Sequence, residues 1–477
     1  MLQINKTLLF IALLVFSTSC KTPSITSSTS NDSQPLPDSF VNSKDTVTIA
    51  HVKWELFYKD TDLKYLIETA LKNNYDLQLA VQKVAIATNN VKLRKGELLP
   101  ILNAGVSAGQ RRFGLFTMDG AGNASTDILP GQVVPENLPD FFAGFNASWE
   151  ADVWGKLRSN KKAAIARFSA TIEGKNAIQT ALIASVAGTY YELLALDNEL
   201  DIIRETIDLQ QDALDIIRVK KQAGVVNELA VKQFEGQVAN SKGFEYEILQ
   251  QIALTENQLH FLCGQFPKPI VRDKSKFAAL DSSLLSAGIP SQLLKNRPDI
   301  RQAELEVAAS KFDVKSARAA FYPSFMITGS VGYQAFSTAL WFQSPESLAY
   351  TLLGNLTAPL LNRSAIKARF NTAKANQTEA LLHYQKNILN GYVEVANELA
   401  TLKNLEQLYA EKDKEVASYQ QSTVIANNLF ETGRATYLEV LMAQRTALDS
   451  KIQLIVTKKL QHQARINLYR ALGGGWQ

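Results

Sequence analysis

Cysteine, histidine and methionine are scarce in this sequence, and their scarcity limits what the chain can do. The 477 residues include two cysteines, four histidines and four methionines, one of which is the initiator. Cys20 belongs to an N-terminal export segment, so Cys263 has no partner for an internal disulfide. No histidine stands at a metal-ligand spacing from a cysteine or another histidine, and no Ser/His/Asp arrangement can be recognised. The sequence therefore predicts no enzyme, no metal site, no cofactor and no methionine-rich path for metal ions.

An excess of one charge and long apolar runs are also lacking. Lys and Arg number 50 and Asp and Glu number 46, which gives a net charge of +4. This balance argues against nucleic acid as a partner. No run of eighteen apolar residues occurs after residue 20, so we expect no internal membrane-spanning helix.

The N-terminus has the pattern of an export signal followed by a lipid attachment site. Residues 1–19 contain one lysine, then an apolar stretch and a run of small residues, as in a secretory signal peptide. The small residues directly precede Cys20, as in a lipobox, so we expect Cys20 to be lipidated and to become the mature N-terminus. The alternative is a signal cleaved elsewhere, with Cys20 incidental. Residues 20–45 are then the lipidated N-terminus and a flexible polar tether.

The rest of the sequence repeats itself. Residues 73–109 align with residues 296–332, and further on Gly224 falls on Gly433. Such internal similarity predicts a duplicated structural unit. Between the two copies lies a stretch rich in proline and lysine, without a clear period. We expect a first repeat at residues 46–264, an equatorial linker at 265–290, a second repeat at 291–473 and a C-terminal tail at 474–477.

Each repeat is predicted to begin with a helix, at about residues 60–98 and 299–320, which Pro100 or Pro323 ends. After each proline the apolar period changes to two, and a second alternating run follows a loop. Each repeat therefore contains a hairpin of strands about ten residues long, with one apolar face and one face of small and polar residues. The apolar face is predicted to include Leu102, Val106, Phe145, Trp149, Phe325, Ile327, Tyr350 and Leu352.

Long helices follow each hairpin. Residues 157–221 contain no proline, and their apolar residues step by three and four. Residues 228–263 carry a second stripe of this kind, and the second repeat matches both. A sustained period near 3.5 predicts coiled-coil-like packing, and a helix of about sixty residues would be roughly 90 to 100 Å long.

Four strands in which apolar residues alternate with small or polar residues suggest a membrane-spanning barrel that is shared between chains. Strands of about ten residues with this alternation are typical of transmembrane β-barrels. Four strands cannot close a barrel with a lumen, and lipid does not tolerate bare strand edges. We therefore expect the chains to associate, and three copies would supply twelve strands. The alternative is a soluble sheet with one buried face.

Two glycine-interrupted stretches, "QAGVVNELAVKQFEGQ" and "ETGRATYLEVLMAQR", stand between the long helices of each repeat. A glycine-rich loop before a helix can hold phosphate, but such a loop needs a strand before it and usually a lysine after it. Both are missing here, so we expect Gly224 and Gly433 to end their helices in a left-handed conformation. The predicted N-caps of the helices that follow are Asn227 and Thr436.

Four motifs carry a resemblance to a known family. They are "GIPSQLLKNRPDIRQAE" at 288–304, Trp-Glu-x-Asp-x-Trp-Gly at 149–155, Ala-Pro-Leu-Leu at 358–361 and Gly-x-x-x-x-Leu-x-x-Leu-x-Ala-Gln at 433–444. Over essentially residues 45–475 the chain resembles the TolC-like outer-membrane factors, and within them the lipidated outer-membrane subunits of RND-type efflux pumps. The resemblance implies an α+β membrane protein, a homotrimer whose twelve-stranded outer-membrane β-barrel continues into a periplasmic α-helical barrel.

The resemblance also implies a function and its partners. It implies a passive duct for small molecules, such as drugs or other toxic compounds, without catalysis. Transport is driven by an inner-membrane RND pump and coupled by a periplasmic adaptor, or membrane fusion, protein, while outer-membrane lipid surrounds the barrel. One alternative is a TolC-type duct that serves protein export with an ABC exporter. The other is a periplasmic coiled-coil scaffold without a pore.

The resemblance places a periplasmic gate just after the second tip glycine. The matching positions here are Leu438, Met442 and Arg445. The middle position is commonly acidic in the family, so Met442 would gate by its bulk and by dewetting instead. Glu439 is the alternative source of carboxylates at the aperture. The alternative role of Leu438, Met442 and Arg445 is to pack against another helix. The tip turns expected to contact the adaptor contain Gly224, Val225, Gly433 and Arg434.

Overall fold

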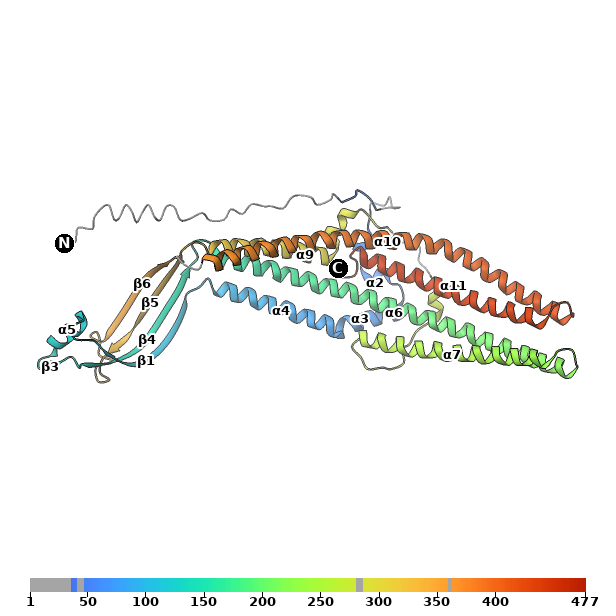
Figure 1. The fold of residues 1–477 in the computed structure, drawn as a ribbon, viewed down its shortest axis with the longest axis horizontal. Helices are drawn as coiled ribbons and strands as arrows, with labels where there is room; N and C mark the ends of the chain where they lie inside the picture. The colour runs from blue at the N-terminus through green and yellow to red at the C-terminus, as the bar shows by residue number, and fades with distance from the viewer. Residues whose placement is uncertain (1–35, 41–46, 280–285, 359–362) are drawn as a thin grey trace. The chain divides into compact units, whose positions relative to one another are not determined.

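A computed structural model describes residues 36–40, 47–279, 286–358 and 363–477 (Figure 1). The predicted signal peptide, Cys20, most of the tether and part of the linker lie outside the described residues. The described chain divides into two compact units. The first unit comprises residues 86–168 and 306–381, and the second comprises the remainder.

The first unit contains an antiparallel sheet of four strands in the order β1-β4-β5-β6. Both β1 and β5 begin immediately after a proline, Pro100 and Pro323, as the change of period predicts. The strands are β1 Ile101–Arg112, β4 Asn137–Ala151, β5 Ser324–Ala335 and β6 Leu348–Thr357. The loop between β1 and β4 holds α5 Met118–Ser125, β2 Asp127–Leu129 and β3 Gln132–Val133.

The register confirms that the predicted apolar residues share one face of the sheet. Phe145 lies opposite Val331, and Trp149 lies opposite Ile327. Because side chains alternate along a strand, the intervening residues form the other face. A polar row crosses that face from β1 to β6 and consists of Asn103, Asn146, Ser330 and Thr351. The last two hydroxyls are hydrogen-bonded at 2.7 Å.

Glycines form a second row on the polar face, where Gly144 pairs with Gly105 on one side and with Gly332 on the other. The backbones of β4 and β5 approach closely at this row. A Cβ atom on Gly332 would lie 2.4 Å from the carbonyl oxygen of Ala143 and 2.6 Å from the Cα atom of Gly144. Only glycine fits such an approach without displacing the backbone.

The second unit is helical and contains two antiparallel pairs, α6 with α7 and α10 with α11 (Figure 1). The pairs are α6 Lys156–Gln222, α7 Glu228–Leu262, α10 Arg363–Glu431 and α11 Tyr437–Ala471, of which α6 and α10 begin in the first unit. The 67 residues of α6 correspond to a length of about 100 Å. The shorter elements are η1 Ile49–His51, α2 Trp54–Phe57, α3 Thr61–Asn73, α4 Tyr75–Gly96, η2 Lys274–Ala278, η3 Pro290–Gln292, α8 Leu293–Asn296 and α9 Pro298–Ala319. Of these, α4 and α9 end in the first unit.

The prediction of one continuous helix over about residues 60–98 is wrong. Asn74 stands in an extended conformation between α3 and α4. Its side-chain oxygen accepts a hydrogen bond from the N–H of Leu77 at 3.0 Å, and its amide donates to the carbonyl of Leu262 at 2.9 Å. Asn74 therefore caps α4 and ties the break to the end of α7, a contact between residues far apart in the sequence.

Two apolar clusters hold the helices of the second unit together. The larger includes Tyr190, Leu193, Leu194 and Leu259, all fully buried, from α6 and α7. The smaller lies toward the tips of the helix pairs and includes Leu214, Ile217, Val231, Phe234 and Val440. Since Val440 belongs to α11 and the others to α6 and α7, the smaller cluster packs one helix pair against the other.

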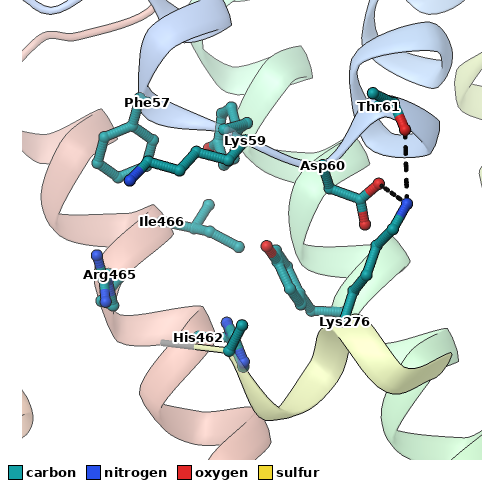
Figure 2. Close-up of a pocket in the computed structure, with 11 residues that line it drawn as sticks. Phe57, Lys59, Asp60, Thr61, Lys276, His462, Arg465 and Ile466 are labelled. Carbon is teal, nitrogen blue, oxygen red and sulfur yellow. Dashed lines mark hydrogen bonds and ion pairs between the residues drawn. The ribbon is translucent and has the colours of Figure 1, made fainter. Parts of the chain in front are cut away.

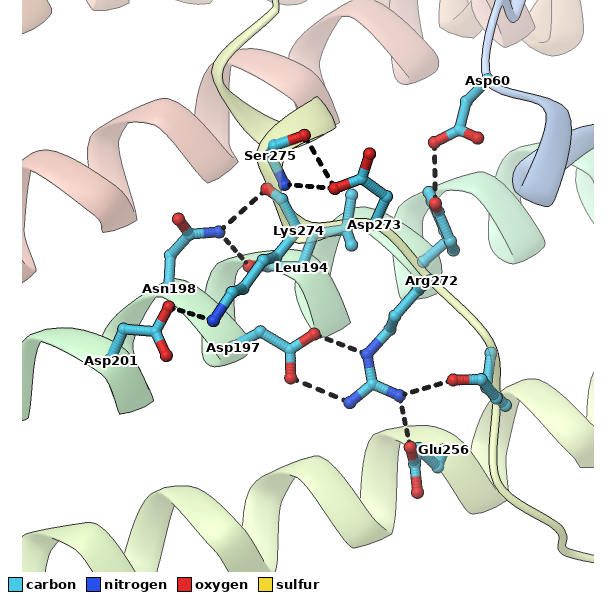
Figure 3. A network of polar contacts seen from close by, with 12 residues as sticks. Asp60, Leu194, Asp197, Asn198, Asp201, Glu256, Arg272, Asp273, Lys274 and Ser275 are labelled. Carbon is cyan, nitrogen blue, oxygen red and sulfur yellow. Dashed lines mark hydrogen bonds and ion pairs between the residues drawn. The ribbon is translucent and has the colours of Figure 1, made fainter. Parts of the chain in front are cut away.

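Ion pairs fasten the linker to the helices of the second unit (Figure 3). Arg272 donates two hydrogen bonds to Asp197 of α6 and one to Glu256 of α7, and the Arg272 side chain is only 14% exposed. Two residues on, Lys274 pairs with Asp201 of α6. A partly buried bidentate pair of this kind is stronger than an exposed one, so the linker is anchored at a defined place on α6.

A second buried guanidinium, that of Arg297, joins three further helices. Arg297 is 6% exposed and binds both carboxylate oxygens of Asp299 at the start of α9. It also donates to Glu394 of α10 at 2.7 Å and to the carbonyl of Ala471 at the end of α11 at 2.9 Å. One side chain therefore links α9, α10 and α11, which gives the Arg-Pro-Asp part of the 288–304 motif a structural role.

Among the described helices, none combines the length and the hydropathy needed to span a bilayer. Within the same residues, no group of three or more His, Cys, Asp or Glu side chains could hold a metal ion.

The close approach at the glycine row predicts a sharp difference between two glycines. Gly332→Val should prevent the sheet from forming, because its Cβ would meet backbone atoms of β4. Gly109→Val on β1 should be tolerated, because no described residue places an atom within 4 Å of its Cβ position. The amount of folded, heat-modifiable protein in membrane fractions measures the effect. Equal yields of the two variants would contradict the prediction.

Candidate functional site at the helix tips

Both helix tips turn at a left-handed glycine, as the sequence predicts. Gly224 has φ 70° and Gly433 has φ 72°. At the first tip the N–H of Val225 bonds the carbonyl of Lys220 at 2.9 Å, and at the second the N–H of Arg434 bonds that of Leu429 at 2.8 Å. These bonds satisfy the last carbonyls of α6 and α10. The side chains of Asn227 and Thr436 cap α7 and α11.

The residues at the turns are accessible. Gly224, Gly433 and Arg434 are exposed, and the Val225 side chain is 68% exposed. Their predicted contact with an adaptor remains a prediction.

The first turns of α11 present two different faces. Val440 is buried in the smaller apolar cluster, and Leu441 packs against it. Leu438, Met442 and Arg445 follow one another at steps of four and three and therefore share the other face. Leu438 is 46% exposed, Met442 is 62% exposed, and Arg445 is exposed. Within the described chain, the structure thus brings the three predicted gate residues together on a face that does not contribute to the smaller apolar cluster.

Glu439 has a different position from these three residues. Its carboxylate accepts hydrogen bonds from the N–H of Thr436 at 2.6 Å and from the Thr436 hydroxyl at 2.9 Å. The Glu439 N–H donates to the same hydroxyl, which completes a capping box. The N–H of Thr436 first, and then its hydroxyl, lowers the pKa of Glu439. The Glu439 carboxylate therefore forms part of the N-terminal cap of α11.

The two tips differ in charge. Around the first tip, Arg218 pairs with Glu235 at 3.0 Å and with Asp215 at 3.3 Å, and Lys232 pairs with Glu235 at 2.9 Å. All of these side chains are substantially exposed, so each pair contributes little to stability. The corresponding stretch of the second tip carries Leu441 and Met442 instead of Lys232 and Gln233. The first tip has an ion-paired surface, whereas the second presents apolar side chains.

Two features of the tips were not predicted from the sequence. The Lys220 ammonium lies 3.9 Å from the ring centroid of Phe430, a cation–π contact between the two helix pairs. No local pattern signals this contact. Asp449, by contrast, is exposed and stands four residues after Arg445, so it lies on the same face of α11 as the predicted gate residues. Helical spacing alone could have identified it.

Comparison with known proteins finds a matching family model and similar proteins of known name. A family model described as "Outer membrane efflux protein" matches residues 66–265 and 289–474. The chain is 28% identical to the "Cation efflux system protein CusC" of Escherichia coli O6:H1, over 93% of this chain and 94% of that protein. It is 30% identical to the "Pyoverdine export outer membrane protein OpmQ" of Pseudomonas putida, over 94% of this chain and 91% of that protein.

The fold has solved counterparts. A crystal structure of CusC superposes with a TM-score of 0.80 at 26% identity, and the match covers 95% of this chain and all of that chain.

The capping box predicts how the second tip responds to pH. The folded-state pKa of Glu439 is lowered, so the carboxylate stabilises the start of α11 above its unfolded pKa and loses this effect as the pH falls through the folded value. Glu439→Ala should accelerate amide hydrogen exchange at the start of α11 near neutral pH. Glu439→Gln should keep the cap, since glutamine also serves at this position, and should show no loss on acidification. Exchange rates, corrected for their intrinsic pH dependence, that are the same in all three proteins would contradict the assignment.

Proposed function

This chain belongs to the outer membrane efflux protein family, and from that premise we propose that it is the exit duct of a tripartite efflux system for small molecules. Its place is the outer membrane, from which it extends into the periplasm. The single observation that carries the proposal is the four-stranded sheet. It has one apolar face, one face of small and polar residues and, within the described residues, two edges without a further strand. Such a sheet suits a barrel wall between lipid and a wet lumen.

Aromatic side chains at both ends of the sheet support a membrane-spanning position. At one end, Trp341 packs against Phe141 and stacks on Phe342. At the other end, Trp154 stacks on Tyr322 at 4.7 Å, and Trp149 bonds the carbonyl of Leu98. Phe141 and Trp149 are about 27 Å apart along β4 at 3.4 Å per residue, or roughly 20 Å across the bilayer when tilted by 45°. This approaches the apolar band of about 25 Å between the aromatic girdles of outer-membrane barrels.

Three copies of the chain complete the duct. The β1 edge of one protomer pairs with the β6 edge of the next, so twelve strands close the barrel and the long helices form a periplasmic α-barrel. Cys20 carries the lipid that adds a second attachment to the outer membrane. The turns at Gly224–Val225 and Gly433–Arg434 contact a periplasmic adaptor, which couples the duct to an inner-membrane RND pump. Solutes pass through without catalysis.

The resting gate is formed by Leu438, Met442 and Arg445. Their shared, exposed face supports this role, and the use of Glu439 in the capping box favours them over Glu439. Three leucines and three methionines around a narrow aperture would exclude water by size and low polarity, which is an effective barrier for ions. The substrates of CusC and OpmQ are, by their names, a cation and pyoverdine, so the class of substrate here is a small solute rather than a protein.

The gate assignment predicts a difference between two equivalent leucines. Leu438→Ala should raise the resting single-channel conductance in planar bilayers by about twofold or more, and Met442→Ala should raise it as well, because both remove apolar bulk from the aperture. Leu229→Ala is the matched control, since Leu229 is the exposed leucine at the same position of the first tip. If Leu229→Ala raised the conductance as much as Leu438→Ala, the second tip would not be the gate.

Removing the gene tests the transport function itself. A deletion strain should accumulate a small apolar fluorescent dye several-fold above the parent, and the wild-type gene should restore efflux. The Gly332→Val variant provides the control that is expressed but not assembled. Unchanged dye accumulation together with the loss of a secreted protein would instead indicate protein export.

A further inference from the structure

The helix ends that adjoin the sheet of the first unit carry a strong excess of positive charge. These stretches are residues 86–97, 152–168, 306–322 and 363–378, which contain the sheet-side ends of α4, α6, α9 and α10. Together they hold fifteen Lys and Arg but only four Asp and Glu, an excess of eleven, whereas the whole chain has an excess of four. The remaining residues are therefore net negative, and the positive charge is concentrated beside the sheet.

The few acidic residues of these stretches already pair with arginines. The pairs are Glu97 with Arg94, Asp152 with Arg158, and both Glu306 and Asp313 with Arg167. Each of the four helices has at least two further cationic side chains that pair with no carboxylate among the described residues, such as Lys92 and Lys95 of α4 and Lys367 and Arg369 of α10. These cations are available to an anionic partner.

Cations beside the linker of the second unit have a different environment. Lys276 binds Asp60 at 2.9 Å and Asp62 at 2.8 Å, and Figure 2 shows its ammonium group at the Asp60 carboxylate. Arg272 binds Asp197 in the same way. Such pairs connect separate segments of the chain and are explained by the fold. The cations beside the sheet make no such connections, so the fold does not explain their concentration.

Two of these cations share one aromatic ring. The ammonium groups of Lys162 of α6 and Lys315 of α9 lie 5.7 and 5.4 Å from the ring centroid of Phe312. Both lysines are exposed, and by these two distances their charges are at most about 11 Å apart. The ring attracts each ammonium, but the two charges repel one another. An anionic group between them would remove this repulsion.

The distance of these lysines from the sheet matches the headgroup layer of a bilayer. Lys162 stands six residues after Lys156, where α6 begins, and Lys315 stands four residues before Ala319, where α9 ends. At 1.5 Å per residue these are about 9 and 6 Å along the helices. The headgroup layer on each side of the hydrocarbon is about 5 to 8 Å thick, and a lysine side chain can extend toward it. Both ammonium groups therefore reach the headgroups when the sheet spans the hydrocarbon.

We infer that these lysines and arginines bind the headgroups of anionic phospholipids in the periplasmic leaflet of the outer membrane. The inference rests on the proposed placement of the sheet in that membrane, with the helices extending into the periplasm. Lipid surrounds a membrane protein on all sides, which fits cations on each of four helices. Lys162 and Lys315, with Phe312 between them, form the best-defined part of this surface. Attraction between cations and anionic headgroups strengthens the attachment at this depth.

Two phospholipids with the same acyl chains test the charge requirement. Full-length protein in a nonionic detergent is titrated with palmitoyl-oleoyl phosphatidylglycerol or with the corresponding phosphatidylcholine, and native mass spectrometry counts the bound lipids. We expect phosphatidylglycerol to bind at least about fivefold more tightly, since one cation near an anionic headgroup contributes about that factor. The preference should weaken between about 0.1 and 1 M ammonium acetate, because the Debye length falls from about 10 to about 3 Å.

Paired variants localise the surface. Lys162→Gln combined with Lys315→Gln should weaken phosphatidylglycerol binding by about tenfold and leave phosphatidylcholine binding unchanged. Lys162→Arg combined with Lys315→Arg should retain the preference, because arginine keeps the charge and also stacks on aromatic rings. The matched control is Lys72→Gln combined with Lys242→Gln, which removes two exposed lysines of the second unit and should change neither affinity.

Equal affinity for the two lipids would overturn the inference, and so would a preference that is the same in the folded glutamine variant and the wild type. A glutamine variant that keeps the lipid preference but becomes less permeable to anions than to cations in planar bilayers would place the lysines in the lumen instead. Wild-type conductance, measured on the same preparation, separates the two proposals. A protein that does not conduct would contradict the duct, whereas a conducting protein without a lipid preference would contradict only the lipid surface.

Discussion

The two outer edges of the four-stranded sheet determine how this protein can exist in a membrane. Within the described residues, β1 and β6 each have one neighbouring strand, so the outer N–H and C=O groups of both strands have no partner in the sheet. Lipid offers them no hydrogen bonds, and every unsatisfied group there would cost several kcal/mol. We therefore propose that this protein pairs the edges of its sheet with those of other copies of itself. On this proposal, assembly is a condition for stable insertion into the outer membrane.

In the proposed assembly, the long helices of each chain also lie beside those of neighbouring chains, in the periplasm. α6 and α10 begin shortly after β4 and β6, so each protomer in a closed barrel contributes two long helices from its wall. Arg272 anchors the linker to α6 and α7, and Arg297 joins α9, α10 and α11, so the second unit has fixed internal connections. Leu438 and Met442 remain exposed in this arrangement, although apolar side chains usually become buried. Their exposure is explained if the opposing surface is another copy of the same tip.

Much of this architecture could be predicted from local sequence patterns. The alternation of apolar residues in strands, the apolar face of a helix, and the helix ends at proline or glycine each depend on only a few neighbouring residues. The shared face of Phe145 and Trp149 and the left-handed turn at Gly433 followed in this way. The helix break at Asn74 was missed because it depends on the carbonyl of Leu262, and the anchoring of Arg272 on Asp197 was missed for the same reason. The Glu439 cap was overlooked although Thr436-x-x-Glu439 is a local capping signature. The aperture stays a prediction from a family resemblance, since a single chain does not show the contacts between chains that would line it.

The stoichiometry of the intact protein in lipid tests whether the edges of the sheet are paired between chains. Native mass spectrometry of the protein released from the outer membrane in nanodiscs counts the copies of a chain whose unprocessed mass is 52.7 kDa. We expect three copies in a particle that conducts ions when it is transferred to a planar bilayer. A monomer that is stable and folded in lipid would contradict it, because the edges of β1 and β6 would then be satisfied without a neighbouring chain.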